Sequence, residues 1–169
     1  NSGIMSTDSW SSRRCRPLSL SSRRCPCLYT TPWKKLHEHT GIRIALDETL
    51  WTNPDPIELP NSAISALILK PGILGGWANT YLWIIHAEKQ KIQTVISSSM
   101  ESGIGLNWIA FTDLCLLNKN TPAGLDSVKF FQNDLADPPF SITQGNYVFA
   151  NSWPVANKDF LSKISQGGW

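Results

Sequence analysis

Short apolar runs that end in polar residues recur through the middle of the chain at similar intervals. They end at Asp47, Lys70, Ser97 and Asp126, which are 23, 27 and 29 residues apart. Such intervals are typical of a strand followed by a helix that leads back to the next strand. The run at 66–69 is apolar throughout, as in a parallel strand buried on both faces. The spacing therefore predicts an α/β fold built on a parallel sheet.

The same pattern predicts the individual elements. We expect strands at 42–46, 66–69 and 94–96, with a weaker strand at 123–125. Helices are predicted at 77–91 and 103–117, and a small helix around Ser62-Ala63 is all that fits the shortest interval. Polar residues at every strand end favour a (β/α) barrel, in which the active site forms at those ends. A dinucleotide-binding sheet is disfavoured because Gly103-Ile104-Gly105 lacks the third glycine of its motif.

The polar residues at these strand ends are the candidate site. They are Asp47, Glu48, Lys70, Ser97, Ser98, Ser99, Glu101 and Asp126. Carboxylates opposite a lysine suit metal-assisted proton abstraction next to a substrate carboxylate, and Mg²⁺ is the natural metal for oxygen ligands. Structural roles are the alternatives: Lys70 could extend into solvent, and Asp47, the serines and Glu101 could cap loops or helix starts.

Four segments resemble the C-terminal half of the barrel of o-succinylbenzoate synthases, which are enolase-superfamily enzymes of menaquinone biosynthesis. These segments are ALDET (45–49), LILKPGILGG (67–76), VISSSMESGIGL (95–106) and PAGLDS (122–127). The resemblance covers about residues 40–135 and implies a partial (β/α) barrel of the enolase-superfamily type, about strands 5–8. It implies a Mg²⁺-dependent dehydration through an enediolate intermediate that yields o-succinylbenzoate. A sister racemase or epimerase of the same superfamily is the alternative.

The resemblance also implies roles for single residues. Asp47 matches the metal ligand of the fifth strand, and Glu48 stands beside it, able to support it from outside the ligand set. Lys70 matches the sixth-strand lysine, whose cation would stabilise a delocalised anionic intermediate. The residues that match the substrate-contacting loop are Ser97, Ser98, Ser99 and Glu101. The family's second-strand lysines and its third- and fourth-strand metal carboxylates have no counterpart here, so we expect little or no synthase activity.

Residues 1–39 form an irregular basic arm that departs from this pattern. The sequence SSRRC occurs at 11–15 and again at 21–25, and no helical or strand periodicity is visible until about Trp33. A nucleic-acid-binding arm, a solvated tail and a frame-shifted or misassembled stretch are the alternatives. We favour the last, because the missing strand motifs should lie in or just before this region. The chain also opens on Asn1, as a fragment would.

Residues 136–169 form a third segment, in which a hairpin is predicted around Gln144-Gly145-Asn146. By the resemblance this segment returns towards a separate capping domain, so we expect Phe130, Phe131 and Phe140 to be exposed. Cys115 is predicted to be a buried, reduced thiol. The tryptophans at 77, 83, 108 and 153 are predicted to lie in the core or in an interface.

Composition limits the cellular compartment and the partners that we expect for the protein. No apolar run approaches the ~20 residues of a membrane span. Cys25 and Cys27 lack zinc-ribbon spacing, although His37 and His39 lie near enough for a metal site to be considered. Nothing in the cysteine pattern requires an oxidising compartment. We therefore predict a cytoplasmic protein that acts on a small carboxylate substrate, without a membrane partner, with a nucleic-acid partner disfavoured and with its oligomeric state left open.

Overall fold

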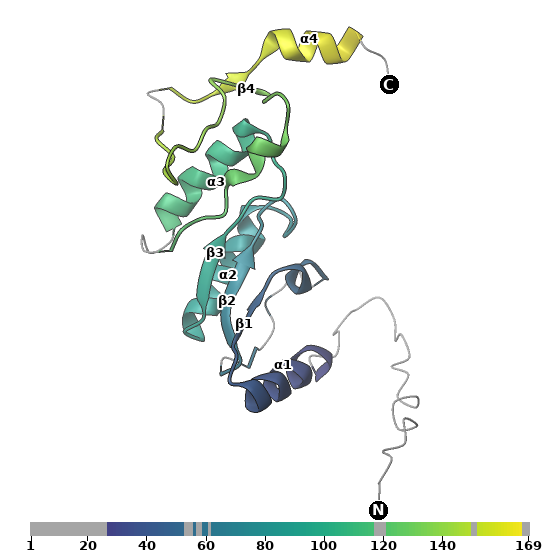
Figure 1. Cartoon of the computed structure of the whole chain (residues 1–169), viewed down its shortest axis with the longest axis vertical. Coiled ribbons are helices and arrows are strands. Elements are labelled where there is room, and N and C mark those ends of the chain that lie inside the picture. The colour runs from purple at the N-terminus through teal and green to yellow at the C-terminus, as the bar shows by residue number, and fades with distance from the viewer. Residues whose placement is uncertain are drawn as a thin grey trace, which may run out of the picture.

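The computed structural model describes residues 27–52, 56, 59–60, 62–116, 121–149 and 152–166. The predictions on the SSRRC repeats and on Cys25 lie outside these residues. Figure 1 shows the elements in chain order. They are α1 (Cys27–Thr40), β1 (Ile44–Leu46), η1 (Glu48–Thr52), β2 (Ile64–Leu69), α2 (Trp77–Lys89), β3 (Gln93–Ile96), α3 (Gly103–Leu116), η2 (Asp126–Phe130), β4 (Ala136–Asp137), β5 (Val155–Ala156) and α4 (Lys158–Gln166), where η marks a 3-10 helix.

The main sheet is parallel, with strand order β1-β2-β3, as the sequence predicted. Leu67 is level with both Leu46 and Thr94, and the register between β1 and β2 shifts by one residue between Ile44 and Ala45. The predicted fourth strand is reduced to one parallel bridge between Gly124 and Ser97. A glycine within a three-residue run gives a strand little to pack, which explains why pairing stops there.

One face of this sheet carries the hydrophobic core. Leu46, Leu67, Leu69 and Ile96 are almost completely buried on it. The helices contribute the buried side chains that complete the core: Trp83, Ile84 and Ala87 from α2, and Leu106, Ile109 and Ala110 from α3. Burying each large apolar side chain contributes roughly 1.5–3 kcal/mol, so this layer is the main source of stability. The predicted crossover helices are confirmed, and α2 ends two residues earlier than expected.

Two predictions on the region before β2 are wrong. Residues 27–39, part of the arm predicted to be irregular, lie in helix α1, although most of its described side chains are exposed. The helix was missed because it lacks a continuous apolar stripe. Its described support is local, including a Lys34–Glu38 ion pair, together with Trp33 against the core. Ser62 and Ala63 form a turn rather than a helix, and the short helix of this interval is η1, directly after β1.

The predicted hairpin is present only as its turn. Thr143 and Asn146 form a single antiparallel bridge around Gln144 and Gly145, both of which have positive φ. This geometry is typical of a two-residue turn of type I′. The antiparallel pair that does form joins β4 to β5, and nothing in the sequence pattern predicted it.

Burial of the aromatic and sulfur side chains differs in part from expectation. Phe130 and Phe131 are exposed as predicted, but Phe140 is only 4% exposed and stacks on Tyr147, with ring centroids 4.3 Å apart. Cys115, predicted to be buried, is exposed near the end of α3. Trp83 is buried, whereas Trp108 is exposed and stacks on Trp153. No helix among the described residues is long and apolar enough to cross a membrane.

Candidate active site

Asp47 and Lys70 form an ion pair at the carboxyl edge of the parallel sheet. Asp47 directly follows β1 and Lys70 directly follows β2, and the Lys70 Nζ lies 2.9 Å from the Asp47 Oδ2. The side chains are 18% exposed for Lys70 and 37% exposed for Asp47. The Trp51 ring, one helical turn beyond Asp47 in η1, lies 5.3 Å from the Lys70 Nζ. Lys70 therefore does not extend freely into solvent, because an anion and an indole face hold its ammonium in place.

The second oxygen of Asp47 has no hydrogen-bond partner among the residues that the structure describes. The Oδ1 atom is buried, although the residue as a whole is not. A buried carboxylate oxygen without a partner is costly, and a catalytic role, a bound water or a bound ion would each account for it. Glu48, the predicted neighbour, begins η1 and is exposed. Among the described residues no group of three acidic, histidine or cysteine side chains gathers to hold a metal, so Asp47 offers one ligand and the set is incomplete.

The loop after β3 lies next to the loop after Lys70. The backbone N–H of Ser99 donates to Glu101 Oε2 at 2.6 Å, and the Ser99 hydroxyl donates to Glu101 Oε1. A Cβ added at Gly72 would lie 2.7 Å from the Glu101 Oε1 and 2.9 Å from the Ser99 Oγ. Glycine at this position therefore permits the two loops to touch.

Ser97 and Ser98 connect β3 to the segment around Gly124. Their hydroxyls both donate to the Gly124 carbonyl, at 3.2 and 3.0 Å, and the Ser98 N–H donates to it at 2.9 Å. Register places Ser97 level with Lys70, on the same face of the sheet. Asp126, in contrast, forms an exposed ion pair with Lys129 three residues later. The structure thus brings Asp47, Lys70 and the serine loop to one edge and gives Asp126 a partner of its own.

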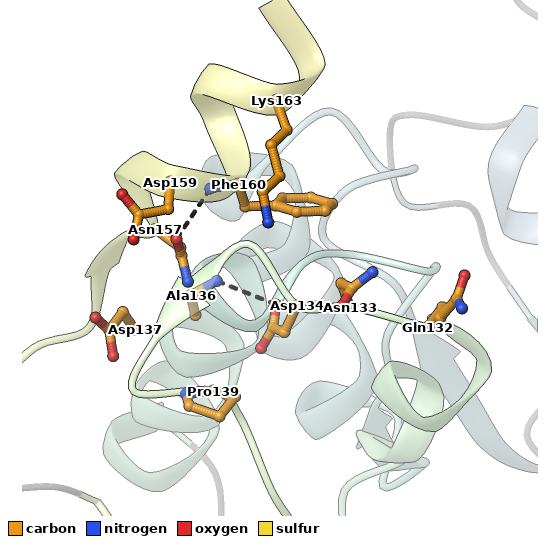
Figure 2. A pocket seen from close by; sticks show the side chains of 10 residues that line it. All are labelled: Gln132, Asn133, Asp134, Ala136, Asp137, Pro139, Asn157, Asp159, Phe160 and Lys163. Atoms are coloured by element: carbon orange, nitrogen blue, oxygen red, sulfur yellow. Dashed lines mark hydrogen bonds between the residues drawn. The ribbon is translucent and has the colours of Figure 1, made fainter. Parts of the chain in front are cut away.

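The ion pair lines neither of two cavities in the described part of the chain, and only the first of them is next to the loops after Lys70 and β3. One, of about 330 Å³, lies between the first turns of α2 and α3 and is lined by Gly72, Trp77, Glu101 and Trp108 among others. The other, of about 500 Å³, lies between the β4 region and α4 and is shown in Figure 2. Three carboxylates line it, but that of Asp134 accepts hydrogen bonds from backbone N–H groups. Neither cavity is lined by Asp47 or Lys70.

Sequence reasoning missed Trp51 and the reason for Gly72. Trp51 carries no motif, and only its place one turn after Asp47 in a short helix brings its ring to Lys70. Gly72 lies within the quoted LILKPGILGG segment, so a signal was present. Its meaning depends on the approach of Glu101, which is distant in the sequence.

The class of protein follows from the fold and from a structural neighbour. No family model matches the chain. A crystal structure of MenC from Desulfotalea psychrophila LSv54 is similar, with a TM-score of 0.52 and 29% sequence identity, covering 69% of this chain and 34% of that one. Together with the parallel sheet and its helices, this likeness supports an α/β fold of the enolase type.

Curated relatives specify the resemblance further. The o-succinylbenzoate synthase of Vibrio cholerae serotype O1 (strain M66-2) is 36% identical over 102 residues, which is 59% of this chain and 30% of the relative. That of Yersinia pseudotuberculosis serotype IB is 29% identical over 113 residues, or 67% and 34%. Protein PHYLLO, chloroplastic, of Arabidopsis thaliana is 37% identical over 81 residues, or 43% and 4%. The predicted resemblance to o-succinylbenzoate synthase is thus confirmed over part of the chain, which spans about a third of the synthases' length.

Proposed function

We propose that this chain carries one part of an o-succinylbenzoate synthase active site of the menaquinone pathway. The observation that supports this proposal most is the Asp47–Lys70 pair, 2.9 Å apart at the ends of adjacent parallel strands. The Ser97–Ser99 loop meets the same edge of the sheet, and the segments concerned are those that resemble the synthases. The proposed substrate is a small carboxylate, and the proposed setting is the cytoplasm.

In this proposal Lys70 stabilises the negative charge that develops next to the substrate carboxylate. An ammonium group has three N–H donors, so Lys70 can keep its bond to Asp47 and still donate to a substrate oxygen. Its low exposure strengthens that interaction relative to one in open water. The Trp51 ring limits where the ammonium can move and so orients it before substrate arrives.

The serine loop would contact the substrate's other polar groups. The hydroxyls of Ser97 and Ser98 donate to the Gly124 carbonyl, and a hydroxyl can rotate to a new acceptor without moving the backbone. Glu101 is proposed to act by holding Ser99, since both of its oxygens accept from that residue. A direct contact between Glu101 and an anionic substrate would be repulsive, so its role here is to position the loop.

Mg²⁺ is the proposed cofactor of a complete site, with the unpartnered Asp47 Oδ1 as one ligand. Mg²⁺ needs near-octahedral oxygen coordination, and one carboxylate leaves most of that shell to water. We therefore propose that this chain alone binds the metal weakly and turns over little or no substrate. No catalytic step is assigned to the metal here.

Ligand binding to the full chain tests the proposed site. We expect o-succinylbenzoate to bind weakly, with a Kd on the order of 1 mM, in NMR titrations. Lys70→Met should weaken binding about tenfold or more, as expected for loss of a charge-assisted hydrogen bond. Lys129→Met is the matched control, because Lys129 also pairs with an aspartate but on the exposed surface. Equal effects of the two substitutions, or no binding to the unmodified chain, would contradict the proposal.

A turnover assay separately tests the proposed incompleteness. With Mg²⁺ and the synthase substrate, we expect product formation at the rate of the uncatalysed reaction. Efficient turnover by the purified chain would refute the incompleteness while leaving the roles of Lys70 and the serine loop open to the binding test.

A further inference from the structure

A buried pair of polar side chains joins the C-terminal segment to the first turn of α3. Asn107 is only 4% exposed, and its Oδ1 accepts a hydrogen bond from the Tyr147 hydroxyl. Its Nδ2 donates to the Gly103 carbonyl at 2.7 Å. Buried polar groups that are hydrogen-bonded specify one arrangement of the elements they join, whereas apolar contacts are nondirectional. The pair therefore determines how the segment around Tyr147 lies on α3.

The same C-terminal region also holds Gly103 through its backbone N–H. This N–H donates to the Asp134 Oδ1 at 2.7 Å. A Cβ added at Gly103 would lie 1.9 Å from the Asp134 Oδ2 and 2.9 Å from the Ala136 Cβ, so the approach leaves no room for a side chain. The first residue of α3 is thus held at both of its backbone groups, at the N–H by Asp134 and at the carbonyl by Tyr147 through Asn107.

The first turn of α3 is in turn packed against the serine loop. The Leu106 N–H donates to the Ser102 carbonyl at 2.9 Å, so the turn begins directly where the loop ends. A Cβ added at Gly105 would lie 2.8 Å from the Glu101 Cβ, which places Glu101 against the helix. Both oxygens of Glu101 accept hydrogen bonds from Ser99. A displacement of this turn would therefore move Glu101, and Ser99 with it.

We propose that Tyr147 is a positioning residue for Ser99, acting through Asn107 and the first turn of α3. That Ser99 belongs to a loop that contacts substrate rests on the proposed function, whereas its coupling to Tyr147 does not. Tyr147 is itself held by two aromatic rings, since Phe140 stacks on it at 4.3 Å and Phe149 meets it edge-on at 4.9 Å. Burial raises the pKa of Tyr147 above its ordinary value of 10.0, so its hydroxyl remains a donor at neutral pH.

NMR spectra of the full chain with Tyr147→Phe test this coupling. The variant keeps the stacked ring and loses only the hydroxyl, so we expect unchanged circular dichroism and a shifted Ser99 amide resonance. Asn107→Leu removes both hydrogen bonds of the pair and should shift that resonance further. Tyr81→Phe is the matched control: Tyr81 is 47% exposed on α2, and loss of its hydroxyl should leave the Ser99 resonance in place. An unmoved Ser99 resonance in Tyr147→Phe would overturn the proposal.

Ligand titration separates a failure of this proposal from a failure of the proposed function. We expect o-succinylbenzoate to bind Tyr147→Phe about threefold more weakly than the unmodified chain, and Tyr81→Phe equally well. An equal dissociation constant for Tyr147→Phe, despite a shifted Ser99 resonance, would overturn the positioning role. If the unmodified chain binds no ligand, the proposed function fails, and the Ser99 resonance still decides whether Tyr147 positions the loop.

Discussion

The sheet region and the C-terminal region of this chain are held together in different ways. In the region from β1 to β3 with α2, the described contacts are dominated by buried aliphatic side chains such as Leu67, Leu69 and Ile84. Such packing is nondirectional, and many sequences with the same periodicity would achieve it. The chain there repeats a strand–helix unit, and strands that follow each other in the sequence lie next to each other in the sheet.

The C-terminal region from η2 to α4 depends on single polar side chains instead. Asp134 accepts hydrogen bonds from the backbone N–H groups of Gly103, Ala136 and Phe140, at 2.7, 3.3 and 2.9 Å. Figure 2 shows its carboxylate joined to Ala136 at the wall of the larger cavity. Asn157 similarly accepts from the Phe160 N–H at the start of α4. The comparison indicates that the stability of the sheet region depends mostly on side-chain volume, and that of the C-terminal region mostly on hydrogen bonds.

A truncation in the sheet core should give the largest effect. We expect Leu69→Ala to lower the free energy of unfolding by about 2–5 kcal/mol, because Leu69 is fully buried between the sheet and its helices. Urea denaturation followed by circular dichroism measures this. Leu82→Ala, on the exposed side of α2, should change it by less than about 0.5 kcal/mol. Similar values for the two would show that the core is not the dominant source of stability.

A nearly isosteric change in the C-terminal region sharpens the comparison. Asp134→Asn alters almost no volume but replaces one acceptor oxygen by a donor. The Gly103 and Ala136 N–H groups share the Oδ1, whereas the Phe140 N–H uses the Oδ2, so one amide oxygen cannot serve all three. We expect the oxygen to stay with the two converging donors, a loss of about 1–3 kcal/mol, and faster hydrogen exchange at the Phe140 amide. Asp137→Asn, which lines the same cavity and is exposed, is the control. Unchanged exchange at the Phe140 amide would contradict the distinction between the two regions.

The sheet region could be predicted from the sequence better than the C-terminal region. The strands before Lys70 and Ser97 and the helices after them were predictable. Their buried side chains recur at the spacing typical of strands and helices, and this spacing is visible in the sequence. Helix α1 and the β4–β5 pair were not predictable. The described support of α1 is largely local, and the pairing of Ala136 with Ala156 depends on contacts between distant segments. Phe140 was misjudged for the same reason, since its burial comes from Tyr147 and not from its own surroundings in sequence.

The candidate site was predictable as far as strand topology determines it. Parallel strands place their carboxyl ends at one edge, so the meeting of Asp47 with Lys70 followed from spacing alone. Side-chain partners did not follow. That Trp51 lies over Lys70, and that the Ser97 and Ser98 hydroxyls donate to Gly124, depends on rotamers and loop paths that periodicity does not encode.

The loop contact at Gly72 tests whether the sheet region, which is held mainly by apolar packing, also depends on a single close contact. It belongs to the sheet region, yet it depends on one close approach, with an added Cβ only 2.7 Å from the Glu101 Oε1. Gly72→Ala should cost about 1 kcal/mol and shift the Ser99 amide resonance, because Glu101 must move. Ile73→Ala, at the exposed neighbouring position, should leave that resonance in place. An unmoved Ser99 resonance in Gly72→Ala would show that the two loops are not coupled.

The smallest expected effect comes from a charge on α3, where the two regions meet. Burial raises the pKa of Asp113 above its ordinary value of 3.8, because desolvation disfavours the carboxylate. Below pH 3.8 the group is protonated whether the chain is folded or unfolded, so it costs nothing there. As the pH rises through the folded-state pKa, stability is lost, since the unfolded chain ionises more readily.

Asp113→Asn should therefore raise the thermal midpoint at pH 7 by roughly 1–2 °C and leave it nearly unchanged at pH 3. Glu88→Gln, an exposed carboxylate on α2, should show no such difference between the two pH values. A midpoint for Asp113→Asn that falls at pH 7 would mean that its carboxylate has a stabilising partner, and that hydrogen-bonding chemistry extends from the C-terminal region into α3.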